Sequence, residues 1–447
     1  MKTLPELPAE IVDRIAQHLL GPYDYFERIK WPHGKTKYLA SLRLTCRSLA
    51  QNIQYSFIRA GFTHHFVDFS MEGLMTLQMI AMHPLFGPRV EVLHFRRYEV
   101  AADMYNSRLR DMKQLQDSGE DEERLDRCIR WVEDWEQDMR DRSFIERSGI
   151  CNSMLYLAFS VLPNVREIHI LAAYRAQGSV GLRQEMSPSE HGEGSTTIMW
   201  SAIFQAVLLS RMQLKLLNIF PRNYRVQYGI SIQALDMPEY LLKKLGHVQE
   251  IRLLLNAQDQ SFGYSQSWWP SLPARFLGFM PSLVKLNLAF DNWDETERIM
   301  ERLRTVHWKQ LEAMKFQGIQ CTKDDLYQLF TNHRSTLRYV KLSNSHLLDG
   351  TWLDVLKSMD QLTRLFKLKL NQLAQDELRV CFPRLGYINH YNDQPLHDDD
   401  FSDWVFVSKL QRYRVEVDDE GNMAVHLREL QVGADSSTRR TRNPDLF

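Results

Sequence analysis

The sequence predicts an α/β protein, in which an N-terminal helical domain precedes an α/β solenoid with irregular helical insertions. Two observations lead to this fold class. Between residues 7 and 50, apolar residues recur at helical spacing. From residue 90 onward, a short apolar pattern typical of a buried strand recurs, with helix-like segments between its copies. We place domain boundaries at 1–60, 61–392 and 393–433, and we expect a disordered tail at 434–447.

Composition excludes several classes of protein. Hydrophobic residues make up 44% of the 447 residues and charged residues 25%, as in ordinary globular proteins. The net charge of −1 argues against a strongly basic nucleic-acid-binding protein. Five scattered cysteines without a Cys-x-x-Cys pair indicate a reducing compartment and no zinc site. Without a signal segment or a long apolar run, we expect a cytoplasmic or nuclear protein that binds no membrane, metal or cofactor.

The first fifty residues contain two amphipathic runs. Pro8 suits the first turn of a helix, where its missing N–H costs nothing. The apolar face of this helix is formed by Ile11, Val12, Ile15 and Leu19. A second run at helical spacing contains Leu39, Leu42, Cys46 and Leu49. On periodicity alone, these helices are equally well explained as a cap on a larger fold.

The order of these residues resembles the F-box, the helical module that docks onto the Skp-family adaptor of cullin–RING ubiquitin ligases. The matching elements are Leu7-Pro8-x-Glu10-Ile11, then Ile15 and Leu19, then Leu42-Arg43-Leu44-Thr45-Cys46-Arg47-x-Leu49. The resemblance covers residues 4 to about 50. It implies that the adaptor is contacted by Leu7, Pro8, Ile11, Ile15, Leu19, Leu42 and Cys46. One departure is the segment 21–38, which is longer than usual and predicts an expanded loop between the first two helices.

The recurring pattern is an apolar residue, two residues, an apolar residue, any one residue and a third apolar residue. Its copies start at Val90, Val165, Leu214, Val248, Leu283, Leu311, Leu337 and Leu365. The last three intervals are 28, 26 and 28 residues, typical of leucine-rich repeats. Helices are expected between the later copies at 294–306, 324–332 and 352–359. The alternative is an irregular α/β domain with several parallel strands.

Two insertions interrupt the early repeats. At 103–147, the residues Leu125, Cys128, Val132, Trp135 and Met139 form one helical stripe, which we expect to pack on the solenoid. The alternative is a partner-binding arm. The segment 178–196 is rich in Gly, Ser and Glu and predicts a flexible loop. Near the C-terminus, 404–417 and 423–430 read as two strands joined by a turn.

We find no enzyme motif, so no catalytic residue is expected. By resemblance, the chain is the substrate-recognition subunit of an SCF-type E3 ubiquitin ligase, with an unknown protein substrate on the solenoid. One alternative is an F-box scaffold that acts outside ubiquitination. Another is a hydrolase or transferase on an irregular α/β domain.

The predicted substrate face consists of side chains that alternate with the buried strand positions. Its lysines include Lys285, Lys315, Lys341 and Lys369. A basic face would attract an acidic or phosphorylated segment, although lysines also merely keep strand faces soluble. The aromatic pair Trp268–Trp269 is the next candidate, because tryptophan is enriched at binding hot spots. The alternative is that this pair covers the edge of the solenoid.

Overall fold

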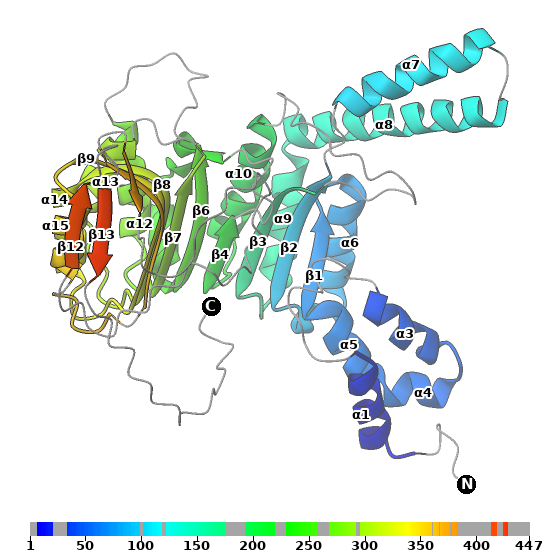
Figure 1. The fold of residues 1–447 in the computed structure, drawn as a ribbon. Coiled ribbons are helices and arrows are strands. Elements are labelled where there is room, and N and C mark those ends of the chain that lie inside the picture. The colour runs from blue at the N-terminus through cyan, green and yellow to red at the C-terminus, as the bar shows by residue number, and fades with distance from the viewer. Residues whose placement is uncertain are drawn as a thin grey trace. The chain divides into compact units, whose positions relative to one another are not determined.

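The computed structural model is an α/β fold with a mostly parallel open sheet, as predicted (Figure 1). It describes residues 7–20, 34–98, 102–118, 122–174, 193–219, 229–256, 268–291, 296–359, 361–365, 367–375, 378–381, 413–417 and 423–427. The chain divides into two compact units, Met1–Leu311 and Glu312–Phe447.

The first unit begins with a cluster of short helices, which we call the N-terminal module. Its helices are α1 (Ala9–Leu20), α3 (Gly34–Arg43), α4 (Arg47–Asn52) and α5 (Gln54–Phe62). The two predicted helical runs are therefore confirmed. The loop expected at 21–38 is too long by five residues, because α3 already begins at Gly34. Residues 21–33 lie outside the described residues.

After the module in the sequence, six parallel strands pair in the order in which they occur along the chain. They are β1 (His64–Asp68), β2 (Val92–Tyr98), β3 (Glu167–Tyr174), β4 (Leu216–Ile219), β6 (Glu250–Asn256) and β7 (Lys285–Phe290). A two-residue strand, β5 (Ile230–Ser231), also pairs parallel with β6. The five strands predicted from the first five copies of the repeat are confirmed. Strands β1 and β5 were not predicted.

Helices pack on one another along one face of these strands (Figure 1). They include α6 (Met71–Met82), α9 (Ile150–Val161), α10 (Glu193–Leu209), α11 (Glu239–Leu242), α12 (Leu272–Gly278) and α13 (Thr296–Leu303). Alternate strand residues are fully buried beneath them, among them Leu93, Ile168, Leu217, Ile251 and Leu286. Helix α10 includes residues 193–196, so the loop expected at 178–196 ends before Glu193. Residues 178–192 lie outside the described residues.

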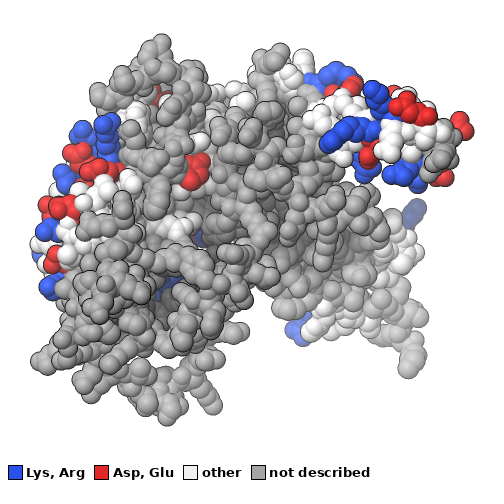
Figure 2. All heavy atoms as spheres, turned by 45° about the horizontal axis from the view of Figure 1, so that its top comes forward, with Lys and Arg blue, Asp and Glu red and all other residues white. Residues whose placement is uncertain are grey.

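The insertion at 103–147 forms a pair of helices, α7 (Ala102–Ser118) and α8 (Glu122–Ser148). One residue of the predicted stripe packs within this pair, because the rings of Trp135 on α8 and Tyr105 on α7 stack with centroids 3.9 Å apart. Helix α8 also contacts α6 and α9. At Trp135 the stripe therefore packs on a second helix of the insertion, where we expected the sheet domain. Figure 2 shows basic and acidic side chains interspersed along this pair. Among the described side chains of α8, Glu123 pairs with Arg127 and Glu136 with Arg140, each at i,i+4 spacing.

The second unit contains three parallel strands, again in sequence order, followed by a mixed edge. The parallel strands are β8 (Ala313–Thr322), β9 (Tyr339–Asp349) and β10 (Lys367–Gln375). The mixed edge consists of β11 (Leu378–Cys381), β13 (Met423–Leu427) and β12 (Tyr413–Val417), in that spatial order. The predicted antiparallel C-terminal strands are confirmed at 413–417 and 423–427. The predicted tail at 434–447 lies outside the described residues.

Two helices connect the parallel strands of the second unit, α14 (Lys323–Asn332) and α15 (Trp352–Met359). Thr322 caps α14, because its side-chain oxygen accepts a hydrogen bond from the amide of Asp325 while the Asp325 carboxylate accepts one from the Thr322 amide. The helices expected at 324–332 and 352–359 are confirmed.

Replacing Leu286 by Asp should lower the free energy of unfolding by about 3 kcal/mol or more, because an unpaired charge would enter the core of the first unit. Chemical denaturation of the variant measures this loss. The matched control is Leu44→Asp, which makes the same change at a side chain that is 87% exposed. Equal stability of the two variants would contradict the assigned position of Leu286.

Candidate functional site

The N-terminal module is built around a small apolar core. Val12 and Ala16 of α1 are fully buried together with Leu39, Leu49 and Ile53 from the other helices. The carbonyl of Pro8 accepts hydrogen bonds from the amides of Ile11 and Val12, at 3.0 and 3.1 Å, and so starts α1. This core orients one face of α1 inward and leaves the opposite face toward solvent.

The predicted adaptor-binding residues divide between these faces. Pro8 is exposed, and Ile11 is 43% exposed although it is apolar. Leu7, Leu42 and Cys46 are half-buried and pack against the module core, which gives them a part in shaping the surface. Ile15 is also half-buried, whereas the side chain of Leu19 lies outside what the structure describes.

One exposed apolar side chain of the module was not predicted. Leu44 lies in the turn between α3 and α4 and is 87% exposed. The turn is held by the Thr45 hydroxyl, which donates to the carbonyl of Leu42 at 2.7 Å. The apolar spacing could not reveal this turn, because Leu42 and Cys46 are four residues apart, as they would be in a helix. The signal that could have identified Leu44 is that it lies off this apolar stripe.

Contacts between aromatic and basic side chains join the module to the sheet of the first unit. The rings of Phe62 at the end of α5 and Phe86 stack at 4.2 Å. The Arg89 guanidinium lies 5.8 Å from the centroid of the Tyr55 ring. Helix α5 thus connects the module core to the first strand.

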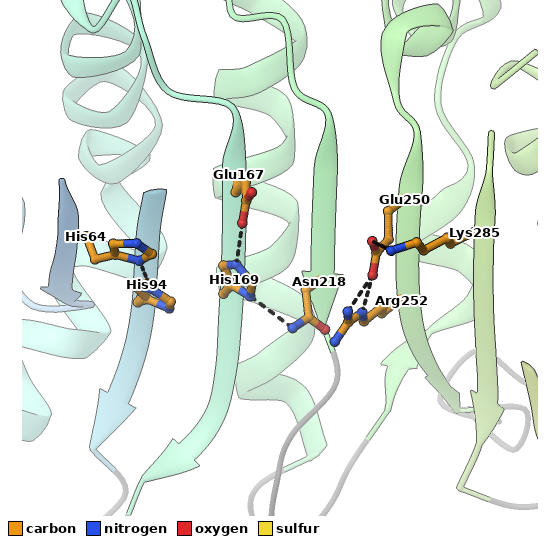
Figure 3. A network of polar contacts seen from close by, with 8 residues as sticks. All are labelled: His64, His94, Glu167, His169, Asn218, Glu250, Arg252 and Lys285. Carbon is orange, nitrogen blue, oxygen red and sulfur yellow. Dashed lines mark hydrogen bonds and ion pairs between the residues drawn. The ribbon is translucent and has the colours of Figure 1, made fainter. Parts of the chain in front are cut away.

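On the strand face opposite the buried aliphatic residues, polar side chains follow the sheet from strand to strand (Figure 3). His94, His169, Asn218 and Arg252 are in register on β2, β3, β4 and β6. We call these four residues the polar row. The rings of His94 and His169 stack at 4.7 Å, and the Asn218 amide nitrogen lies 3.0 Å from Nδ1 of His169.

Neighbouring residues extend the polar row at both ends (Figure 3). His64 Nδ1 lies 3.4 Å from His94 Nε2. Glu250 accepts a hydrogen bond from Arg252 Nε at 2.7 Å and pairs with Lys285 Nζ at 3.4 Å. The positive charges of Arg252 and Lys285 thus converge on one carboxylate. Lys285, predicted to be part of a basic substrate face, is compensated by Glu250.

Burial governs the titration of His169. Loss of solvent lowers the pKa of His169 below its ordinary value, and the hydrogen bond that the ring donates to the Glu167 carboxylate only partly opposes this effect. That same hydrogen bond, together with nearby positive charges, lowers the pKa of Glu167. Because the His169 side chain is only 5% exposed, it is poorly placed to exchange protons with a substrate. The row is better suited to fixing the register of the strands.

The remaining three predicted lysines lie together in the second unit. Lys315, Lys341 and Lys369 are directly in register on β8, β9 and β10, and we call them the lysine row. Lys315 Nζ lies 5.3 Å from the centroid of the Tyr339 ring. Lys367 Nζ lies 5.5 Å from the same centroid.

Tyr339 and Lys367 lie two residues before Lys341 and Lys369 on their strands, and hence on the same face. Burial raises the pKa of Tyr339, so its phenol stays protonated. Burial and the nearby Lys369 ammonium lower the pKa of Lys367 to about 8. Two ammonium groups therefore lie near one tyrosine ring in a partly desolvated setting.

The aromatic pair Trp268–Trp269 belongs to the first unit. Trp268 is 41% exposed, and its carbonyl accepts a hydrogen bond from the Ser271 hydroxyl at 2.6 Å. Trp269 is half-buried at the start of a short 3-10 turn, followed by the buried Pro270. Only Trp268 therefore presents much of its ring to solvent.

Sequence comparisons identify no relative: no family model matches the chain, and no curated protein matches it. Within the described residues, no helix is long and apolar enough to cross a membrane. In the same part of the chain, no group of three or more His, Cys, Asp or Glu side chains is arranged to hold a metal ion.

The lowered pKa of His169 predicts a loss of stability in mild acid. Below pH 6.5 the unfolded chain takes up a proton at His169 that the folded chain resists, so the free energy of unfolding should fall as pH falls. One such proton contributes up to about 1.4 kcal/mol per pH unit. Denaturation midpoints measured from pH 7 to pH 5 should show a shallower slope for His169→Gln than for the unchanged chain.

The control for this experiment is His247→Gln, which removes an exposed histidine of the same unit. It should leave the slope unchanged. The explanation would be wrong if both variants changed the slope equally, because burial of His169 would then not be the cause.

Proposed function

We propose that this chain is the substrate-recognition subunit of an SCF-type E3 ubiquitin ligase, with the N-terminal module as an F-box. The observation that carries the proposal is the agreement between motif and geometry in the module. The Leu7-Pro8-x-Glu10-Ile11 run starts α1, and the module core leaves Pro8 and Ile11 accessible. The half-buried Leu42 and Cys46 support this surface from the second helical run.

The exposed apolar side chains of the module support a protein partner. Ile11 and Leu44 present apolar surface that the described helices of the module leave exposed. Burying a side chain of this size contributes about 1.5–3 kcal/mol. A Skp-family adaptor that covered both would gain a substantial part of its binding free energy from them.

The sheet domain is proposed to hold the substrate as a leucine-rich-repeat-like solenoid. Its support is the parallel pairing of strands in sequence order within each unit and the regular spacing of the later repeats. In this function the chain supplies no catalytic group. It raises the effective concentration of a substrate lysine near the charged conjugating enzyme that the cullin–RING assembly carries.

The proposal predicts that Ile11→Arg abolishes co-precipitation of a Skp-family adaptor, because a charge would replace an accessible apolar side chain. The double change of Leu7 and Pro8 to Ala should have the same effect. Leu7 also packs against the module core, so Ile11→Arg is the cleaner of the two variants. Circular dichroism and thermal unfolding check that both variants stay folded.

The matched control is Met79→Arg, which places the same charge on an exposed apolar side chain of α6. It should retain the adaptor. If Ile11→Arg and the double variant both retain full adaptor binding, the module is not an F-box. Co-purification of a cullin with the unchanged chain then separates a ligase subunit from a scaffold that uses the adaptor outside ubiquitination.

A further inference from the structure

The lysine row concentrates positive charge on one face of the second unit. Lys315, Lys341 and Lys369 are cross-strand neighbours, and adjacent strands lie about 4.8 Å apart. Like charges directly opposite one another destabilise a sheet. A negatively charged ligand bound along the row would relieve this repulsion.

The positions on either side of the lysine row contain no acidic residue. In register before it are Ala313, Tyr339 and Lys367, and after it Gln317, Ser343 and Asn371. Among the described residues, no carboxylate forms an ion pair with Lys341, the central lysine. The face thus provides cations and neutral hydrogen-bonding groups, which is the chemistry that binds carboxylates.

Ser343 gives a second, independent indication of a ligand. It lies two residues after Lys341 on β9, hence on the same face, and is only 5% exposed. Its hydroxyl has no hydrogen-bond partner within the part of the chain that the structure describes. A buried hydroxyl without a partner costs about 1–3 kcal/mol. An acceptor bound beside Lys341 would remove this cost.

Tyr339 helps to preorganise the site. Lys315 and Lys367 approach its ring from the strands on either side, at 5.3 and 5.5 Å from the centroid. These contacts restrict two flexible side chains before any ligand arrives, which reduces the entropy lost on binding.

We infer that the lysine row, together with Ser343 and Lys367, binds an acidic peptide segment of a protein partner. The site extends across three strands, so it fits several carboxylates along a chain better than one compact anion. The lysine row and the positions in register before and after it make nine positions, and none of them is an arginine. Arginine is the side chain that best matches phosphate geometry. In the proposed function the segment belongs to the substrate. The assignment of the segment to the substrate rests on the proposed function, whereas the binding of an acidic peptide does not.

The test is fluorescence anisotropy of a labelled peptide rich in glutamate with the purified full-length chain. Affinity should fall about tenfold or more when Lys315, Lys341 and Lys369 are changed together to Gln, and it should weaken with added salt. A peptide with glutamine in place of every glutamate should not bind. The variant should melt at the same or a higher temperature than the unchanged chain, because like charges have been removed.

Ser343→Ala provides a readout that separates binding from a purely structural role. It removes a hydroxyl without a partner, so thermal stability should stay the same or rise, while affinity for the acidic peptide falls about threefold. Lys357→Gln is the matched control, because Lys357 is an exposed lysine on α15 that pairs with Asp354. This control should bind the peptide normally.

Unchanged affinity in the triple variant would overturn the inference. Equal binding of the glutamine peptide would overturn it too, as would stronger binding of a single-stranded oligonucleotide than of the acidic peptide. Inorganic phosphate alone should compete weakly, and tight binding of phosphate would also contradict the inference. Adaptor co-precipitation is measured on the same variants. If the triple variant loses the peptide but keeps the adaptor, the lysine row is the peptide-binding site. If the unchanged chain does not bind the adaptor, only the proposed function is rejected.

Discussion

The fold depends on one constraint, the burial of alternate residues of parallel strands beneath helices. In each repeat the second and third apolar residues of the pattern lie two positions apart, as in Leu286 and Leu288, and both are buried. Because side chains of a strand alternate between faces, this burial also fixes which residues point the other way. A shift of one residue in any strand would expose its aliphatic residues and bury polar ones. The hydrophobic face therefore sets the register on which both polar surfaces depend.

One residue lies between these two apolar positions in each repeat. Strand register places these residues side by side on neighbouring strands. In the first unit they are His94, His169, Asn218 and Arg252 along successive strands, and in the second they are the lysine row. The same position in the repeat has thus been used in two ways. In the first unit His169 bonds to Asn218 and Glu167, and Arg252 bonds to Glu250, whereas in the second unit all three residues are positively charged. Polar groups that bond to neighbours within a sheet stabilise it, and a row of like charges suits a ligand of opposite charge.

Much of this architecture could be predicted because apolar spacing is a local signal. The eight repeat strands, the later helices and the module core all follow from residues a few positions apart. What depends on distant neighbours could not be predicted. Lys285 looked like part of a basic face until the register placed it beside Glu250. The apolar stripe on α8 indicates that another element packs against it. It does not identify that element as α7, whose Tyr105 stacks on Trp135. Strand β1 was missed because its two histidines and terminal aspartate obscure the apolar alternation around Val67.

The order of the strands also has a consequence for synthesis on the ribosome. From β1 to β4, and again from β8 to β10, each strand pairs with one that has already emerged, so the sheet can grow as the chain is made. The C-terminal edge breaks this rule. Strand β13 lies between β11 and β12, so β12 leaves the ribosome before the only strand with which it pairs in the described part of the chain. Completion of this edge must therefore wait for the last part of the chain, whereas the earlier strands can form as soon as they are translated.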